Sequence, residues 1–402
     1  MLNDEFITAL IGLREFRAID GQIAEDGSVT IEVELFNQVA ICPHCQAVCF
    51  SVLAYLPRRI RDLSICGRKV YLSYDWRRFR CQSCRRSFVE RLAAVELGSH
   101  QTKRYEEEVA RQVKDSTVKA VADRERLNWE TVQRIVERVG QRKGLFNVPK
   151  VVRWVSFDEI SLKKRHRLFS LVIGAPEEGK VLDLLEGRTK EKLLEWIYRT
   201  WTKEQREQVE VVTIDMWDGY FWAALEAFPN AIITIDRFHV EKNLLSAISK
   251  LRRQIQKQLP GAQQKQMKGV RWLLVSNYDH LSEKKKEELD RILASCPELA
   301  LCHHVKEEFR DWYEEECEPQ EAEKELKKWI KLAESLGSQA MTNFVKTLKN
   351  WKEWILNYFE ERASNGFAEG LNNALQLLKR RAFGFRNFGN FRLRALLLHA
   401  FP

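Results

Sequence analysis

The sequence predicts a multidomain protein in which a cysteine-containing β region and a helical hairpin precede an α/β domain that is interrupted by an all-α segment. Three observations lead to this expectation. Two Cys-x-x-Cys pairs lie within residues 1–98, β-branched runs alternate with helical patterns over 149–240, and residues 241–360 read as helices with mixed charge. At 402 residues, the chain is long enough for several separate cores.

Composition and charge narrow the class of protein. The chain is 45% hydrophobic and 31% charged, and it has no apolar run long enough for a membrane helix. The N-terminal segment MLNDEFITALIGLREF has no basic stretch followed by an apolar one, so no secretory signal is expected. Nine cysteines without such a signal favour a reducing cytoplasm over a disulfide framework. The net charge of +9 favours a polyanionic partner.

The two cysteine pairs predict a metal site in residues 1–98. Cys42-Pro-His-Cys45 and Cys81-Gln-Ser-Cys84 each have the spacing that points two thiolates at one cation, and together they complete a tetrahedral zinc shell. Strand-like runs such as residues 69–74 separate the two pairs, which is the layout of a zinc ribbon. A redox Cys-x-x-Cys is the alternative. We expect one zinc ion, held by all four cysteines.

Basic residues gather around the second cysteine pair, and aromatic residues are interleaved with them. Few acids accompany them, so contact with DNA phosphates is favoured over a plain solvated face. The candidate DNA-binding residues of this stretch are Arg58, Arg59, Arg61, Arg77, Arg78 and Arg80.

Residues 99–148 predict a helix-turn-helix. Apolar residues recur at helical spacing on both sides of a break at Leu127 and Asn128, which is typical of two short amphipathic helices joined by a turn. Thr131, Gln133 and Arg134 would then face a DNA groove. Any helical hairpin gives the same pattern, so the basic ribbon beside it is what favours DNA reading.

The segment 149–240 predicts strand-strand-strand-helix-strand-helix-strand, which is the ribonuclease H-like order of a mixed sheet. Three apolar runs end in an acid, at Asp158, Asp215 and Asp236. Since the ends of neighbouring strands meet along one sheet edge, these carboxylates could converge on hard cations such as Mg²⁺ or Mn²⁺. Two such ions would stabilise both oxygens of a phosphodiester displacement. A turn or helix-cap role is the alternative for any single Asp.

A further acid is expected from later in the chain. The segment Ser364 to Asn373 begins a helix, and Glu369 lies in or near its first turn. A Glu favoured there by the helix dipole is the alternative, and the spacing does not choose between the two.

These residues resemble the ISL-three family of bacterial insertion-sequence transposases over nearly the whole chain. The resemblance is carried by the cysteine pairs and by the segments RRIRDL, SFDEIS, IDMWDGY, IDRFHV and SNGFAEGLNNALQLLKRRAFGFRNFGNFRLR. It implies an Asp-Asp-Glu triad at Asp158, Asp215 and Glu369, with Asp218 as the rival for the second position. The IDRFHV segment looks like the D-x-x-H motif of other DDE groups that carry a helical insertion. This resemblance implies that Asp236 and His239 support the metal-binding acids.

The resemblance also implies how the rest of the chain is organised. Residues 241–360 would be an all-α insertion, and residues 361–402 would add the closing helix of the catalytic domain and a basic C-terminal segment. Within that segment, the expected phosphate contacts are Lys379, Arg380, Arg381 and Arg386.

The expected function is that of a DDE transposase, which binds the ends of its mobile element and catalyses metal-dependent strand cleavage and strand transfer. The partners would be the terminal inverted repeats and the target, both double-stranded DNA, in the bacterial cytoplasm at the nucleoid. Pairing two ends calls for at least a homodimer. The alternatives are a DNA-binding regulator with the same N-terminal region, or a structure-specific nuclease that performs no transposition.

Overall fold

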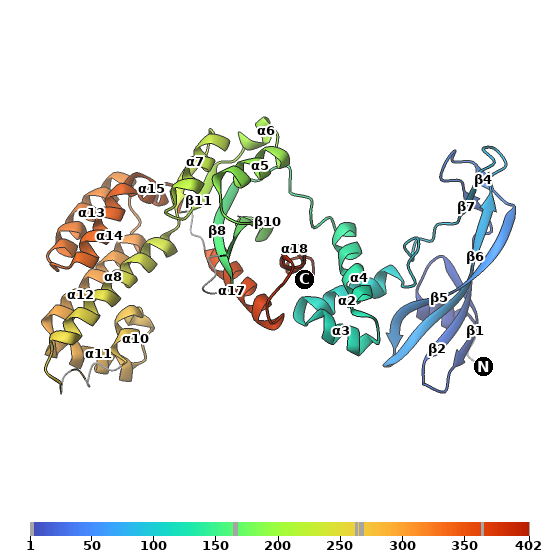
Figure 1. Cartoon of the computed structure of the whole chain (residues 1–402), viewed down its shortest axis with the longest axis horizontal. Helices are drawn as coiled ribbons and strands as arrows, with labels where there is room; N and C mark the ends of the chain where they lie inside the picture. The colour runs from blue at the N-terminus through green and yellow to red at the C-terminus, as the bar shows by residue number, and fades with distance from the viewer. Residues whose placement is uncertain (1–3, 164–167, 262–263, 265–268, 363–365, 402) are drawn as a thin grey trace. The chain divides into compact units, whose positions relative to one another are not determined.

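A computed structural model describes most of the chain, in the ranges 4–163, 168–261, 264, 269–362 and 366–401 (Figure 1). The chain divides into two compact units, one formed by Met1–Leu145 with Ala400–Pro402 and the other by Phe146–His399. Among the helices of the described ranges, none is long and apolar enough to cross a membrane.

The N-terminal unit begins with a short helix, α1 (Asp4–Ile11), and a β-sheet forms its body. Its strands follow the order β1-β2-β6-β5, and their bounds are β1 Phe16–Ile23, β2 Val29–Leu35, β5 Val52–Ile65 and β6 Arg68–Arg80. Apolar residues alternate with exposed ones along β6, so one face packs a core that includes Val70, Leu72 and Trp76. Gly67, with φ of 74°, completes the tight turn of the long β5–β6 hairpin.

The cysteine pairs occupy two turns beside this sheet. The first pair lies between β3 (Ala40–Ile41) and β4 (Val48–Cys49), and the second lies between β6 and β7 (Ser87–Val89). Phe79 and Phe88 stack with ring centroids 5.8 Å apart beneath the turns. This apolar base is small, so the turns depend on further support from whatever the cysteines bind.

Three helices complete the N-terminal unit, namely α2 (Lys103–Asp115), α3 (Val118–Glu125) and α4 (Trp129–Arg142). The side chains of Thr102, Thr117 and Asn128 each cap a helix by accepting a backbone N–H. Apolar residues that include Val109, Val121, Ile135 and Val139 form a buried seam between the helices.

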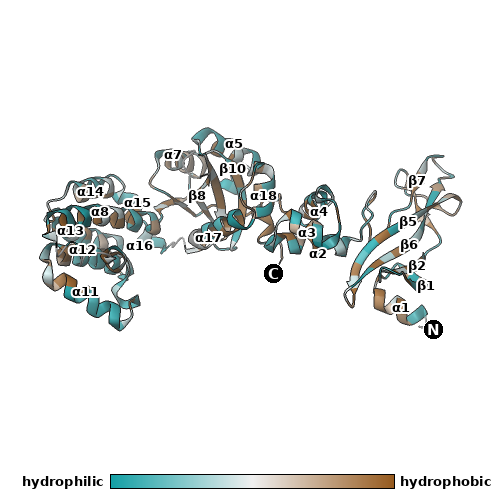
Figure 2. Ribbon diagram, turned by 60° about the horizontal axis from the view of Figure 1, so that its bottom comes forward, coloured by the Kyte–Doolittle hydropathy of each residue, from teal (hydrophilic) through white to brown (hydrophobic). Residues whose placement is uncertain are grey.

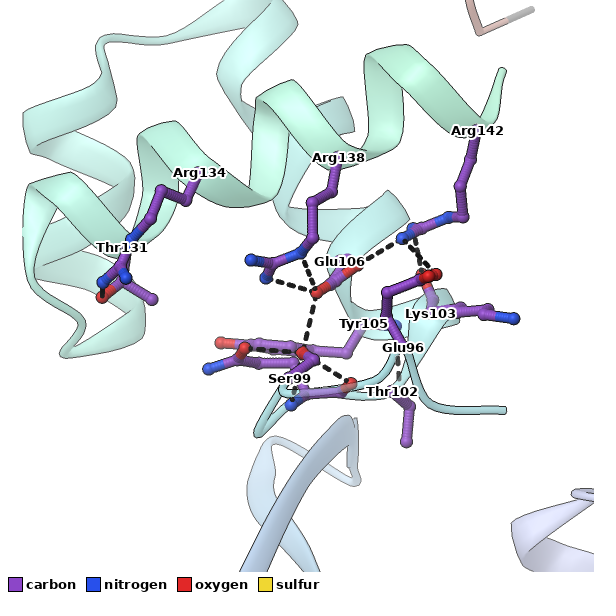
Figure 3. A network of polar contacts seen from close by, with 11 residues as sticks. Glu96, Ser99, Thr102, Lys103, Tyr105, Glu106, Thr131, Arg134, Arg138 and Arg142 are labelled. Atoms are coloured by element: carbon purple, nitrogen blue, oxygen red, sulfur yellow. Dashed lines mark hydrogen bonds and ion pairs between the residues drawn. The ribbon is translucent and has the colours of Figure 1, made fainter. Parts of the chain in front are cut away.

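A buried carboxylate fixes α2 against α4 (Figure 3). Glu106 is fully buried and accepts hydrogen bonds from Arg138 Nε at 3.0 Å and from Ser99 Oγ at 2.9 Å. Arg142 forms an ion pair with the same carboxylate from one turn further along α4. Because a buried charge must be compensated by partners, this network sets the packing of the two helices.

A five-stranded mixed sheet forms the centre of the second unit, in the order β10-β9-β8-β11-β12. The strands are β8 Trp154–Lys163, β9 Leu168–Ala175, β10 Lys180–Glu186, β11 Val211–Ile214 and β12 Ile232–Ile235. The first three form an antiparallel meander, and β11 and β12 are parallel to β8. Hydrophobic residues run along β8 and β10 (Figure 2), and β11 is buried throughout, as parallel strands covered on both faces require.

Helices connect and cover this sheet. They are α5 Lys190–Thr200, α6 Lys203–Arg206 and α7 Asp218–Ala227. α5 packs on α7, which contacts β11 and β12. Phe157 of β8 packs against Tyr220 and Phe228, so the sheet and these helices share one core.

A helical region follows β12. Its elements are α8 Arg237–Gln258, α10 Val270–Val275, η1 Tyr278–His280, α11 Glu283–Ser295, α12 Pro297–Glu314, α13 Pro319–Glu334, α14 Gln339–Asn350, α15 Lys352–Leu356 and α16 Tyr358–Glu361. α8, α12, α13 and α14 pack as a bundle (Figure 1). The ring centroids of Phe309 and Trp329 lie 4.5 Å apart at its centre, and the Trp329 Nε1–H donates to the Val305 carbonyl at 2.8 Å.

The chain then returns to the sheet through α17 (Gly366–Arg381) and α18 (Phe388–Leu397), which contact β8 and β10 respectively. Gly174 of β9 allows this close approach. A Cβ there would lie 2.6 Å from Ser156 Oγ and 3.1 Å from the Phe367 ring. A side chain at 174 would therefore clash with Ser156 of β8 and crowd the Phe367 ring of α17.

The structure corrects one expectation about the strands. Asp215 and Asp236 do directly follow β11 and β12, but Asp158 lies in the middle of β8. β8 continues past Asp158 because its other edge stays paired with β9 as far as Lys163.

The Glu106 network predicts a large, local stability effect. Glu106→Ala removes the buried carboxylate and leaves Arg138 and Arg142 without their partner. The free energy needed to open the packing of α2 on α4 should therefore fall by about 2–4 kcal/mol. Amide hydrogen exchange measures this opening separately from the second unit. Glu108→Ala is the matched control, since it removes an exposed pair with Arg111 and should change the value by about 0.5 kcal/mol or less. Equal effects of the two variants would contradict the account.

Candidate active site and zinc centre

Three carboxylates occupy one row of the second sheet. Ser156, Thr213 and Thr234 are direct cross-strand partners on β8, β11 and β12. Since side chains on one face recur every second residue, the next row on that face belongs to Asp158, Asp215 and Asp236. Asp158 and Asp236 are buried, whereas Asp215 is partly exposed.

His239 joins two of these acids from the first turn of α8. Its Nδ1 contacts the Asp215 carboxylate, and its Nε2 lies 3.8 Å from Asp158 Oδ1. Asp236 caps the same helix by accepting the Phe238 N–H at 3.0 Å. Asp236 therefore fixes the helix end that carries His239. Asp158, Asp215 and His239 each offer a ligand atom within 4.8 Å of the others.

The closeness of these groups changes their acidity. Burial and the neighbouring Asp215 carboxylate raise the pKa of Asp158 to about 7. Burial alone would lower the pKa of His239, but the Asp215 and Asp158 carboxylates outweigh it and raise that pKa. The site therefore concentrates negative charge that only protons or a cation can neutralise.

A helix from the end of the chain completes the surroundings of Asp158. Asn372 of α17 donates its Nδ2–H to Asp158 Oδ2. Its Oδ1 is buried and, among the described residues, has no hydrogen-bond partner. An unsatisfied amide oxygen on a side chain that contacts Asp158, together with the Asp158 and Asp215 carboxylates, is a donor set that suits Mg²⁺ or Mn²⁺. The residues present therefore fit a hard divalent cation.

The remaining predicted acids lie in different places. Asp218 is exposed in the first turn of α7 and lies outside the cluster of Asp158, Asp215 and His239. Glu369 lies in α17, one turn before Asn372, and its side chain is outside the described part of the structure.

The four predicted zinc ligands come together. Cys42 Sγ lies 3.7 Å from Cys84 Sγ, and Cys45 Sγ lies 3.5 Å from Cys81 Sγ. Sulfurs at the corners of a tetrahedral zinc site with 2.3 Å bonds are about 3.8 Å apart, so these spacings fit Zn²⁺. The Cys84 backbone N–H, which points at the Cys81 sulfur, is the main cause that lowers the pKa of Cys81 to about 6. A thiolate is thereby favoured at one ligand position.

The basic residues of the ribbon divide into two groups. Arg58, Arg59, Arg78 and Arg80 are exposed, as the prediction requires. Arg61 and Arg77 are buried, and the prediction that they contact DNA is wrong. Arg77 donates to Glu90 Oε2 at 2.7 Å and to the Asn37 carbonyl at 2.9 Å. Arg61 lies over the ring of Tyr105 and 3.6 Å from Glu125. Both hold the unit together instead.

The other candidate DNA contacts lie on helix surfaces. In α4, Arg134 is exposed, and Thr131 and Gln133 are partly exposed. Figure 3 shows Thr131 and Arg134 side by side at the start of this helix. Arg380, Arg381 and Arg386 are exposed at and after the end of α17. Lys379 differs from them, since its Nζ donates to the Ser161 carbonyl of β8 and so ties the helix to the sheet.

A basic groove beside the site was not predicted. It has a volume of about 560 Å³ and lies along α8 and α10. Its lining includes four cations, Lys242, Arg252, Arg253 and Arg271, and one acid, Glu241, which pairs with Arg237. None of these four cations forms an ion pair within the described ranges. Burial, with the charges of Arg253 and Arg271, lowers the pKa of Arg252, as expected for uncompensated positive charge.

One end of this groove is lined by Phe238, the residue before His239 in the first turn of α8. His239, Ser246 and Arg253 recur every seven residues, so they lie in one row along α8. Arg253 is 14 residues from His239, which is about 21 Å along the helix. The recurrence at seven is a signal that the sequence offers, but the apolar residues on the other faces of α8, such as Val240, Leu244 and Ile248, obscure it.

Comparison with known families covers most of the chain. A family model described as a transposase, of the ISL3 group of DDE enzymes, matches residues 155–395. A model described as the helix-turn-helix domain of transposase family ISL3 matches residues 90–140. A third, described as the zinc-finger of transposase IS204/IS1001/IS1096/IS1165, matches residues 38–84.

Individual relatives agree with these matches. The transposase for insertion sequence element IS1001 of Bordetella parapertussis is 28% identical over 413 residues, which span 100% of this chain and 99% of the relative. The transposase for IS1557 of Mycobacterium tuberculosis is 26% identical over 67% of this chain and 65% of the relative. A Lactococcus lactis protein named as an ATP-dependent protease is 33% identical over only 31% of this chain, which shows neither family nor activity.

The sulfur cluster predicts a zinc content of about one ion per chain. Cys81→Ser should remove that zinc and lower the melting temperature of the N-terminal unit, because its small apolar base cannot hold the turns alone. Elemental analysis of the purified chain measures the zinc. Cys66→Ser is the control, since Cys66 is exposed at the β5–β6 turn and lies outside the cluster. Zinc retained by Cys81→Ser, or lost from Cys66→Ser, would contradict the assignment.

Proposed function

This chain belongs to the ISL3 family of insertion-sequence transposases, and we propose that Asp158, Asp215 and Glu369 are the acids of its catalytic site. The observation that carries the proposal is the convergence of Asp158 and Asp215 with His239 at the start of α8. Asp215 is preferred over Asp218 because Asp218 is exposed outside this cluster. Glu369 is proposed as the third acid because it lies in α17, one turn before Asn372. Asn372 is hydrogen-bonded to Asp158 and so brings this helix to the site.

The strand order β10-β9-β8-β11-β12, with parallel crossovers through helices, supports a ribonuclease H-like assignment for this sheet. Residues 149–240 and 361–402 then form the catalytic domain, and residues 241–360 form its insertion. Residues 1–98 form the zinc ribbon, and residues 99–148 form the helix-turn-helix.

The chain's own residues prepare the site for phosphodiester chemistry. Asp158, Asp215 and Glu369, with Asn372 Oδ1, would hold two Mg²⁺ or Mn²⁺ ions. When bound, such ions activate water and stabilise charge on the attacking and leaving oxygens. His239 balances the charge of Asp158 and Asp215, and it is placed to exchange a proton with Asp215. Asp236 positions His239 by capping α8.

The exposed cations give the DNA several points of contact. Arg58, Arg59, Arg78 and Arg80 of the ribbon and Thr131, Gln133 and Arg134 of the helix-turn-helix bind the terminal inverted repeats. The groove along α8 binds the phosphates of the DNA strand that extends from the cleaved position. The pairing of two element ends requires at least a homodimer, which acts on DNA at the bacterial nucleoid.

The carboxylate assignment predicts loss of cleavage without loss of binding. Asp158→Asn and Asp215→Asn should each lower the rate of Mg²⁺-dependent cleavage of element-end DNA by about a thousandfold or more, since charge stabilisation of this kind contributes several kcal/mol. Gel shifts should show DNA affinity that is unchanged or increased. Asp218→Asn is the matched control and should cleave normally. A reversed pattern, with Asp218→Asn inactive and Asp215→Asn active, would overturn the choice of second ligand.

The groove predicts a change in the salt dependence of binding. Replacing both Arg252 and Arg253 by Ala removes up to two phosphate contacts, so the slope of log K against log salt should flatten by about 1–2. A titration of end DNA at several salt concentrations measures the slope. The control replaces Lys284 and Lys285 of α11, which are exposed but lie outside the groove. If both pairs change the slope equally, the groove has no special part in binding.

A further inference from the structure

The turn that ends α17 exposes a large aromatic side chain. Phe383 is 94% exposed, the highest value among the large hydrophobic residues that the structure describes. Its backbone is left-handed, with φ of 53°, and Gly384 follows with φ of 92°. The backbone N–H groups of Phe383 and Gly384 donate to the carbonyls of Arg380 and Lys379 at 3.1 and 2.9 Å. A position that normally takes Gly or Asn therefore holds a bulky ring that is almost wholly exposed.

The surroundings of Phe383 are strongly basic. Arg380, Arg381 and Arg386 are exposed around it, and the sequence contains no acid after Glu369. Arg380 and Arg386 form no ion pair within the described ranges. An exposed ring among unneutralised guanidinium groups fits a nucleic acid, because phosphates pair with the cations while the bases offer an apolar stack.

The turn lies close to the catalytic acids. α17 contacts β8 at two points, where Asn372 donates to Asp158 and Lys379 donates to the Ser161 carbonyl. Asn372 and Lys379 are seven residues apart in the helix, a rise of about 10.5 Å, and Asp158 and Ser161 are three residues apart in the strand, a rise of about 10 Å. The two contacts are therefore equally spaced on both elements, and α17 runs in the same direction as β8. Phe383 lies eleven residues after Asn372, in the turn that follows α17. Measured along the helix axis, it is about 15 Å from the end that contacts the carboxylates. That distance corresponds to about four or five base steps of DNA at 3.4 Å each.

We propose that Phe383 is a wedge that inserts into the base stack of the element end, four or five steps from the phosphate that is cut. Arg380 and Arg386 hold the phosphates on either side of the opened step. The unstacked step lets the backbone bend, so that the target phosphate reaches the buried acids. The inference rests on the proposed function, since it requires cleavage at Asp158 and Asp215.

The test compares fully paired end DNA with the same DNA carrying a mismatch at the opened step. Phe383→Ala should bind both within about threefold of the unchanged chain but cleave paired DNA at least about tenfold more slowly, because unstacking a step costs a few kcal/mol. The mismatch should restore its cleavage to within about threefold, because the base is already unpaired. Phe383→Trp should cleave paired DNA normally. 2-Aminopurine placed at the step should brighten with the unchanged chain and not with Phe383→Ala.

The controls separate the possible failures. Phe6→Ala removes an exposed phenylalanine from α1 and should leave cleavage unchanged. The melting temperature of Phe383→Ala should not fall, since the ring is 94% exposed and buries little surface. If Phe383→Ala cleaves both DNAs equally slowly or equally fast, the wedge is overturned. If it changes the sedimentation of the DNA-free protein, the ring packs on a second copy, and the wedge is also overturned. If Asp158→Asn still cleaves the mismatched DNA, the proposed function itself fails.

Discussion

The pairing register of β8, β11 and β12 is the constraint on which the rest of the site depends. It aligns Ser156, Thr213 and Thr234 in one row and so brings Asp158, Asp215 and Asp236 together in the next. A slip of one residue on any strand would turn its acid to the opposite face. Burial, together with repulsion from the nearby Asp215 carboxylate, explains why the pKa of Asp158 is raised. Folding thus stores unfavourable charge that cation binding would relieve.

Two helices that are far apart in sequence turn this row into an enclosed site. α8 brings His239 to Asp215 and Asp158, and α17 brings Asn372 to Asp158. More than a hundred residues of the helical region lie between them. That region packs its own core around Phe309 and Trp329, so it can hold α8 rigid from the acids to the basic groove. Gly174 in turn lets α17 lie against the sheet.

Much of this organisation could be predicted from local patterns. The cysteine spacing predicted that the four cysteines come together, and the apolar runs predicted the strands that precede Asp215 and Asp236. The mid-strand position of Asp158 could not be predicted, because it depends on the pairing of β8 with β9 on the other edge. The sequence predicts DNA contacts at Arg61 and Arg77 because charge density does not reveal burial against Glu125 and Glu90. The groove is not evident in the sequence because Arg271 joins the three cations of α8 only when α10 packs on that helix.

The most direct test of the central claim is anomalous diffraction from crystals of the chain grown with Mn²⁺ and element-end DNA. The account predicts manganese peaks between Asp158 and Asp215, with Glu369 and Asn372 Oδ1 also among the ligands, and ligand distances of about 2.0–2.3 Å. Peaks at Asp218, or no manganese beside Asp158 in DNA-bound crystals, would contradict it.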